Sequence, residues 1–166
     1  MKIFEEKTTW GDEEFFCEYI DDLDFSKIKP ITQAQALCFT SDGEFVIYED
    51  TQGNYGLPGG SVEKGESLEE ALFRELREEA AVRPIDYGPL LYLKVTNLSK
   101  KPPKVTYQVR YWAHVELLNE GTSDPDGKAI KRHLVDEKGL LEYVKWGKKL
   151  KIYLDQMKKL RKQTSL

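Results

Sequence analysis

Cysteine, histidine and methionine are scarce in this sequence, and long apolar runs are absent. Its 166 residues include only two of each of these three types. No segment approaches the roughly 18 consecutive apolar residues of a transmembrane helix, and the first residues show no apolar signal-peptide core. We therefore expect a cytoplasmic protein. Cys17 and Cys38 sit in apolar, strand-like segments, so we expect buried free thiols in place of a disulfide.

Charge is plentiful and unevenly distributed. A charged fraction of 33% beside an apolar fraction of 40% is typical of a soluble globular protein, and the length favours a single domain over residues 1–166. The net charge of −4 argues against a nucleic-acid coat protein. Acidic residues gather at 12–24 and 63–79, whereas residues 145–162 are basic. An acidic protein that acts on polyphosphates needs a cation to bring two anions together, so we expect a metal.

The apolar pattern predicts strands, one central helix, further strands and a helical tail. Residues 1–30 form an N-terminal extension with a predicted hairpin from Lys2 to Tyr19. The other predicted strands are Gln33–Thr40, Glu44–Tyr48, Leu90–Thr96, Val105–Leu118 and Ala129–Val135. This order is not the regular alternation of a doubly wound sheet. We predict an α+β fold in which a mixed sheet is sandwiched between helices and carries an N-terminal hairpin.

A glycine-rich loop over residues 53–65 leads into a predicted helix over residues 67–80. Leucines recur at a spacing of four in this helix, and no breaker occurs before Pro84. Ser67, with Glu70 three residues later, matches the capping-box pattern of a helix start. Glycines in the loop allow its backbone to approach a ligand without side chains in the way.

Glutamates gather on one face of this helix. At about 100° per residue, Glu75, Glu78 and Glu79 fall within an arc of about 100°. These carboxylates repel one another, and a bound divalent cation reverses that effect. Hard oxygen ligands of this kind are those that Mg²⁺ prefers, although a solvated acidic helix is the commoner origin of such a pattern. Arg74 is placed to pair either with Glu70 or with a carboxylate of the loop.

The spacing of these residues favours the metal site. The fixed positions run Gly60, five residues, Glu66, seven residues, Arg74-Glu75-Leu76, one residue, Glu78-Glu79, one residue, Ala81-Val82. This segment resembles the Nudix box, Gly-x5-Glu-x7-Arg-Glu-U-x-Glu-Glu-x-Gly-U, in which U is a bulky aliphatic residue. Every fixed position matches except one, where Ala81 replaces glycine. The sequence is thus similar to the Nudix hydrolase family.

The departure at Ala81 concerns the end of the helix. Glycine there would end the helix in a left-handed conformation, which costs a residue with a Cβ roughly 1 kcal/mol. Either Ala81 accepts this strain or the helix runs slightly further before Pro84. No ligand atom is lost in either case.

The resemblance implies a hydrolase that binds Mg²⁺ or Mn²⁺. It implies Glu78 and Glu79 as ligands together with the Gly60 carbonyl, and Glu75 as a ligand or the general base. It also implies that Glu66 supports the site and that Arg74 orients a glutamate. Other family members draw the base from a separate loop, where Asp124 and Asp126 are our candidates here, followed by Glu116 and Glu120. A simple turn is the alternative for residues 124–127.

The resemblance further implies attack of water on phosphorus in a nucleoside diphosphate linked to another group. ADP-ribose, nucleotide sugars, dinucleoside polyphosphates and nucleoside triphosphates all fit, and capped RNA is the one nucleic acid among the candidates. Tyr55 and Arg110 are our candidate substrate-binding residues, for stacking and for phosphate. The further candidates for these two roles are Trp10, Tyr107, Tyr111, Trp112, Lys100, Lys101 and Lys104, for which packing or solvation is the ordinary explanation.

Four further expectations concern the tail, the histidines, the function and the oligomeric state. Residues 140–164 are predicted to form an amphipathic helix with Trp146 in its apolar stripe, and RNA binding is the alternative for its lysines. His114 and His133 are predicted to be packed residues. A Nudix-fold binding module without catalysis is the alternative function, and an isomerase would need a catalytic thiol in the cleft. Family members are often dimers, and the hairpin at 2–19 is a candidate interface.

Overall fold

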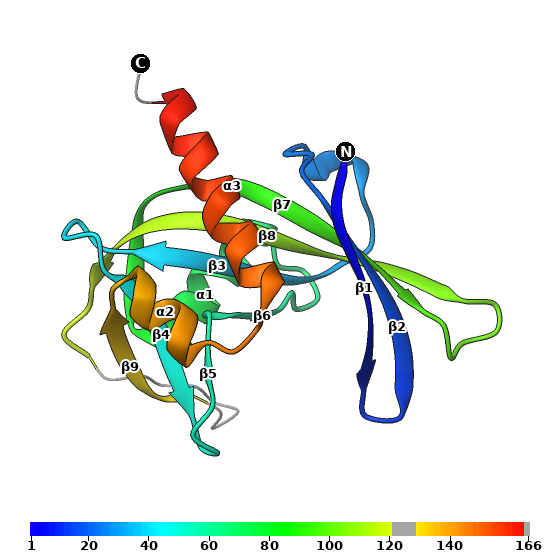
Figure 1. Ribbon diagram of the computed structural model, residues 1–166, viewed down its shortest axis with the longest axis horizontal. Coiled ribbons are helices and arrows are strands. Elements are labelled where there is room, and N and C mark those ends of the chain that lie inside the picture. Colours follow the sequence, from blue (N-terminus) through cyan, green and yellow to red (C-terminus); the bar gives the residue numbers. More distant parts are fainter. Residues whose placement is uncertain (121–128, 165–166) are drawn as a thin grey trace.

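The computed structural model describes residues 1–120 and 129–164, and its elements follow the predicted order (Figure 1). The strands are β1 (Lys2–Trp10), β2 (Glu13–Ile20), β3 (Ile31–Phe39), β4 (Phe45–Asp50), β5 (Tyr55–Gly56), β6 (Gly59–Ser61), β7 (Val82–Asn97), β8 (Lys104–Leu117) and β9 (Ala129–Val135). The helices are α1 (Leu68–Ala80), α2 (Glu137–Tyr143) and α3 (Lys148–Thr164), with a 3₁₀ turn η1 at Phe25–Lys27. None of the described helices is long and apolar enough to span a membrane.

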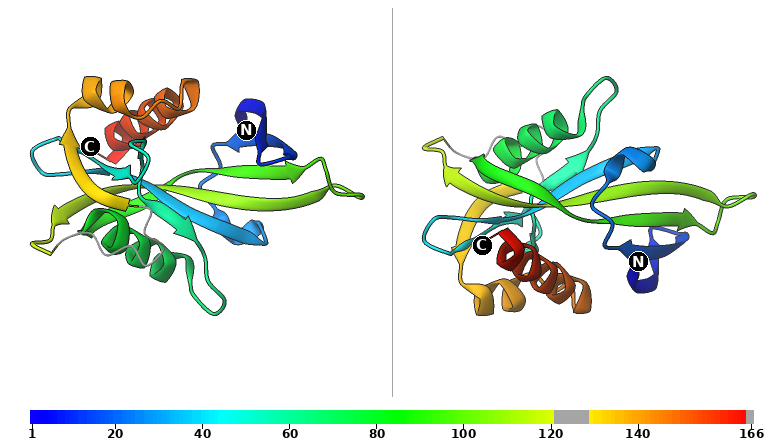
Figure 2. Two further views of the ribbon diagram at one scale, coloured as in Figure 1. Left: turned by 90° about the horizontal axis from the view of Figure 1, so that it is seen from below. Right: turned by 90° about the horizontal axis from the view of Figure 1, so that it is seen from above.

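The strands form one mixed sheet between helices. Their order is β1-β2-β7-β8-β3-β4-β5, with β6 on β3 and β9 on β4. β3 and β8 run parallel, whereas the other pairs are antiparallel. Figure 2 shows α1 on one face of the sheet and α2 with α3 on the other. The predicted fold class, including the hairpin of β1 and β2, is confirmed.

Alternation along β3 divides the apolar core between the two faces. Ala34 and Cys38 belong to a buried cluster with Leu72 of α1. Leu37 belongs to the other cluster, with Tyr153 of α3. Successive side chains of a strand point to opposite faces, so β3 anchors both layers of helices. Both cysteines are buried and free, as expected.

One predicted strand start and one predicted loop were wrong because tertiary pairing extends the sheet. β7 begins at Val82, well before the predicted Leu90. It includes Pro84 and Pro89, and the register of β7 on β8 shifts beside each proline. Proline lacks a backbone N–H and is accommodated in strands at such irregularities. The predicted loop over residues 53–65 contains the short strands β5 and β6.

The C-terminal tail forms two helices, α2 and α3, where a single amphipathic helix was predicted. Gly147 has a φ of +68°, and Val144 at the end of α2 is already extended. Trp146 therefore lies in the linker between α2 and α3, and its predicted place in a helical stripe was wrong. The backbone conformation of Gly147 is one that side chains rarely adopt, which explains the break.

Ala81 accepts the left-handed conformation, with φ 48° and ψ 51°. It is the only residue other than glycine with positive φ among those the structure describes. Its N–H donates to the carbonyl of Arg77 at 3.0 Å, and its side chain is buried. The box therefore ends its helix as glycine would end it, at the cost of local strain.

Replacing Ala81 by glycine should change the free energy of unfolding by less than about 1 kcal/mol. Relief of about 1–2 kcal/mol of left-handed strain is offset by loss of a buried methyl worth about 0.8 kcal/mol and by the freer unfolded chain. Ala81→Val should destabilise by about 2 kcal/mol, because a β-branched residue is an outlier there. Urea denaturation measures both variants, and strong stabilisation by Ala81→Gly would contradict this balance.

Candidate active site

Two glycines bring the loop backbone against both β3 and α1. A Cβ added at Gly59 would lie 2.4 Å from Cα of Gln35, and one added at Gly60 would lie 2.5 Å from the carboxyl carbon of Glu75. No side chain fits at either position without a shift. The glycines at these two places in the sequence are therefore explained by close approach of backbone and carboxylate.

Glu79 is held by the first of these glycines, Gly59. Its side chain is only 5% exposed, and its Oε1 accepts a hydrogen bond from the Gly59 N–H at 2.8 Å. It follows Leu76 by three residues on α1, next to the buried face of the helix. A carboxylate buried to this extent is costly unless it is hydrogen-bonded, so the Gly59 amide stabilises Glu79 in its buried position.

Arg74 joins the loop to the helix. Its Nε and Nη2 donate to the two carboxylate oxygens of Glu66 at 2.8 and 3.0 Å, and Nη2 also donates to the carbonyl of Ser61. Its Nη1 donates to Glu75 at 2.8 Å and to Glu78 at 3.3 Å. Of the two partners weighed from the sequence, the structure pairs Arg74 with the loop carboxylate.

Glu66 is the central anion of this network on the loop side. Hydrogen bonds from Arg74, and then from the backbone N–H of Glu63, lower the pKa of Glu66 to about 2. The same hydrogen bonds between Arg74 and Glu66 raise the pKa of Arg74 above its ordinary value. Both groups are therefore charged across the neutral range, and the loop keeps its position relative to α1.

The donor set fits a divalent cation, although the carboxylates are gathered around a protein cation. No three acidic, histidine or cysteine side chains within residues 1–120 and 129–164 are already grouped as a metal site. Nη1 of Arg74 contacts Glu75 and Glu78 together. Three carboxylates beside the close backbone at Gly60 are nevertheless hard oxygen donors of the type that Mg²⁺ takes. A bound ion would compete with Arg74 for them.

The candidates for a base outside the box are distributed differently. Glu116 pairs with Arg83, and Glu120 pairs with Arg77 at 2.8 Å, so both described carboxylates are engaged in exposed ion pairs. Asp124 and Asp126 lie outside the described residues.

Sequence reasoning missed Arg132 on β9. Its Nη1 donates to the carbonyls of Ala80, Ala81 and Leu118, at 3.3, 2.8 and 3.3 Å. The last carbonyls of a helix lack partners within the helix, and a cation is favourable at this end of the helix dipole. Arg132 thus secures the end of α1, next to Glu78 and Glu79. Nothing local in the sequence signals this contact, because Arg132 lies about fifty residues after the end of α1 and meets it only in the folded protein.

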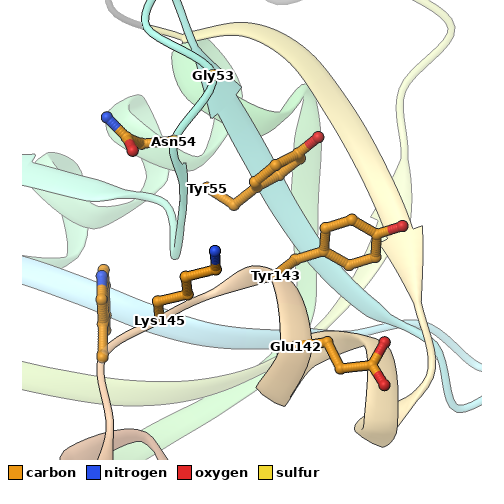
Figure 3. Close-up of a pocket in the computed structure, with 7 residues that line it drawn as sticks. Gly53, Asn54, Tyr55, Glu142, Tyr143 and Lys145 are labelled. Carbon is orange, nitrogen blue, oxygen red and sulfur yellow. The ribbon is translucent and has the colours of Figure 1, made fainter.

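Two cavities lie on the sheet face away from α1. Tyr55 borders a cavity of about 580 Å³ between β5 and the α2–α3 linker, together with Asn54, Tyr143 and Lys145. Figure 3 shows Lys145 extending toward Asn54 and Tyr55. Arg110 borders a second cavity of about 300 Å³. Trp146 lines both, so the two cavities are neighbours.

Arg110 is more buried than expected of a phosphate-binding residue, with 7% exposure. Its Nε donates to the Tyr153 hydroxyl at 3.1 Å, and Nη2 donates to Gln108 at 2.9 Å. Among the other aromatic candidates, Tyr107 and Trp112 contact further rings of the fold. The histidines are packed as predicted, each with a polar partner and a ring contact.

The shifted pKa of Glu66 predicts a pH dependence of stability. The folded pKa of about 2 lies below the ordinary 4.5, so the stabilisation by Glu66 is complete above about pH 4.5 and is lost as pH falls toward 2. The melting temperature of the wild type should therefore exceed that of Glu66→Gln at neutral pH. The gap should narrow between about pH 5 and about pH 3. Thermal melts without metal measure this difference in melting temperature, with the exposed Glu70→Gln as control. A difference that does not change with pH would contradict the ion pair between Glu66 and Arg74.

Comparisons with known proteins agree with this geometry. The family model described as NUDIX domain matches residues 31–154. No curated protein sequence matches the chain. A pyrophosphohydrolase of Bacillus subtilis, BsRppH, has a similar structure, with a TM-score of 0.71 and 24% identity over 95% of this chain and 97% of that one.

Two other solved structures share the fold at lower identity. A NUDIX hydrolase of Nitrosomonas europaea matches with a TM-score of 0.61 and 15% identity, over 78% of this chain and 88% of that one. An Ap4A hydrolase of C. elegans matches with a TM-score of 0.52 and 14% identity, over 81% and 99% of the two chains. With three quarters of its residues in the family model and the box carboxylates held by Gly59 and Arg74, this chain belongs to the Nudix family.

Proposed function

We propose that this protein is a Mg²⁺-dependent hydrolase that cleaves a phosphoanhydride bond in a nucleoside diphosphate linked to another group. The observation that carries the proposal is the network of Glu66, Arg74, Glu75 and Glu78, with Glu79 on the Gly59 amide. A chain that had lost catalysis would be under no need to keep all three of Glu75, Glu78 and Glu79 on one helix face at a cost in repulsion. The intact set therefore favours the enzyme over a binding module.

Glu75, Glu78, Glu79 and the Gly60 carbonyl would hold the metal. When bound, Mg²⁺ or Mn²⁺ neutralises charge on the phosphoryl oxygens and lowers the pKa of water. Glu75, as an alternative to a ligand role, removes the proton of the attacking water, and Asp126 is the second candidate for that step. Arg74 and Glu66 hold the loop and helix in register, which keeps the carboxylate oxygens in place.

The nucleotide is proposed to bind on the side of the two cavities. Arg110 supplies positive charge to the smaller cavity, and Lys149 is a second cation in its lining. Tyr55 offers a ring at the edge of the larger cavity. The substrate classes are ADP-ribose, nucleotide sugars, dinucleoside polyphosphates, nucleoside triphosphates and capped RNA. Cleavage yields a nucleoside monophosphate and a phosphorylated group, or pyrophosphate from a triphosphate.

Glu79→Gln should reduce turnover by two orders of magnitude or more, the scale of losing one such electrostatic contact. The amide retains an oxygen that can accept from the Gly59 N–H, so the fold should persist. Turnover of each substrate class with Mg²⁺ and identification of products by mass measure the effect. Glu70→Gln, on the exposed first turn of α1, is the matched control and should be as active as the wild type. Near-normal turnover by Glu79→Gln would refute the assignment.

Mg²⁺ should raise the melting temperature of the wild type, because an ion that binds only the folded state stabilises it by mass action, by about 2.7 kcal/mol at a hundredfold excess over Kd. The shift should be smaller in Glu79→Gln and unchanged in Glu70→Gln. Thermal melts across millimolar Mg²⁺ and Mn²⁺ measure it. A wild type that melts at the same temperature throughout would contradict the metal site.

A further inference from the structure

The smaller cavity has a wall that comes from outside the family domain. Trp10, at the end of β1, lines it, although the family model begins only at residue 31. Trp146, in the α2–α3 linker, also lines it, and the floor includes Gln33 and Gln35 of β3. The N-terminal hairpin is thus part of a cavity whose remaining lining belongs to the matched domain.

The hairpin is firmly placed relative to this cavity. β2 pairs with β7 from Phe15 to Ile20, and Cys17 and Tyr19 are buried in the core. The Tyr19 hydroxyl donates to Glu6 at 2.8 Å, and the Glu6 carboxylate also lies 3.7 Å from the Lys149 ammonium of α3. The wall is therefore built into the sheet and tied to the helix on its other side.

Both tryptophans have a neighbour that fixes the ring in place. Trp10 packs on Phe15 with ring centroids 4.5 Å apart, yet 44% of its surface remains exposed. The Lys149 ammonium lies 5.7 Å from the Trp146 ring centroid. Trp10 is exposed and Trp146 is partly buried, and both line the cavity. Aromatic rings in a cavity lining offer flat surfaces for another ring, and nucleobases of any sequence stack on such rings.

The floor contains a polar atom that needs a partner. Oε1 of Gln35 is buried and has no hydrogen-bond partner among the described residues, whereas Nε2 donates to the Leu57 carbonyl at 3.3 Å. Leaving a buried acceptor unsatisfied is unfavourable, so a shift of the Gln35 amide that brings this oxygen to a ligand N–H in the cavity would be stabilising. The edge of a nucleobase carries such donors.

The cavity adjoins the box through β3. Gln33 pairs with Ser61 and Gln35 with Gly59, while Ala34 between them packs on the α1 side. The same three-residue stretch therefore presents amides to the cavity on one face and supports Gly59–Gly60 at its edge. A nucleotide that lies here has its phosphates close to the segment that positions the glutamates.

We propose that the base of the substrate nucleotide binds in this cavity, stacked on Trp10 with Trp146 on the other wall and with its edge on the Gln35 amide. Trp10 is then a specificity-determining residue supplied by the N-terminal hairpin. This assignment rests on the proposed function for its substrate, and its binding test does not depend on turnover.

Calorimetric titration without metal provides the test, with AMP, GMP, CMP and UMP as probes and ribose 5-phosphate as the probe that lacks a base. At least one nucleotide should bind the wild type about tenfold more tightly than ribose 5-phosphate. Trp10→Ala should lose about tenfold in nucleotide affinity, the scale of one base–aromatic stack, and leave ribose 5-phosphate binding unchanged. Trp10→Phe, which keeps a ring, should retain most of the affinity.

Thr9→Ala, exposed beside Trp10 and outside the cavity lining, is the matched control and should bind as the wild type does. Melting temperatures establish that each variant is folded. Equal nucleotide affinity of Trp10→Ala and wild type would overturn the proposal, as would a wild type that binds no nucleotide more tightly than ribose 5-phosphate. Base-dependent binding through Trp10 without any hydrolysis would support this site and refute only the proposed enzyme.

Discussion

The ion-pair network around Arg74 is the interaction on which the site depends. One part-buried guanidinium, which also donates to the Ser61 carbonyl, contacts Glu66 from the loop and Glu75 and Glu78 from α1. Without Arg74, the negative charges of the loop carboxylate and the helix carboxylates would repel one another. The planar guanidinium binds both oxygens of Glu66 through Nε and Nη2, while Nη1 remains free to donate to Glu75 and Glu78 on the helix. A lysine, with a single ammonium group, does not reproduce this geometry.

Backbone geometry beside α1 and at its C-terminal end supports this network. Beside the helix, the absence of side chains at Gly59 and Gly60 allows β6 to lie directly on β3 and on the carboxylate of Glu75. At the C-terminal end, Ala81 turns the chain in a left-handed conformation and Arg132 donates to the last carbonyls of the helix. The helix that carries the glutamates is therefore fixed by contacts with β3 and β9, and its own propensity contributes less.

Much of the fold was predictable because its signals are local. Ser67 caps α1 by accepting from the Glu70 N–H, as the capping pattern predicted, and β3 follows its apolar alternation closely. The errors arose where pairing partners are distant in sequence. β7 extends through two prolines because β8 lies alongside it, and the short β6 exists only because β3 is its neighbour. Gly147 was a local signal for the break before α3 that the apolar stripe concealed.

By itself the sequence determined the helix, the face on which its glutamates lie and the family, because these follow from spacing along one element. Only the tertiary structure decided that Arg74 pairs with the loop and that Arg132 closes the helix end. It also decided that Trp10 and Trp146, far apart in sequence, line one cavity. Such contacts join segments whose separation along the chain carries no periodic signal, so only the packed sheet brings them together.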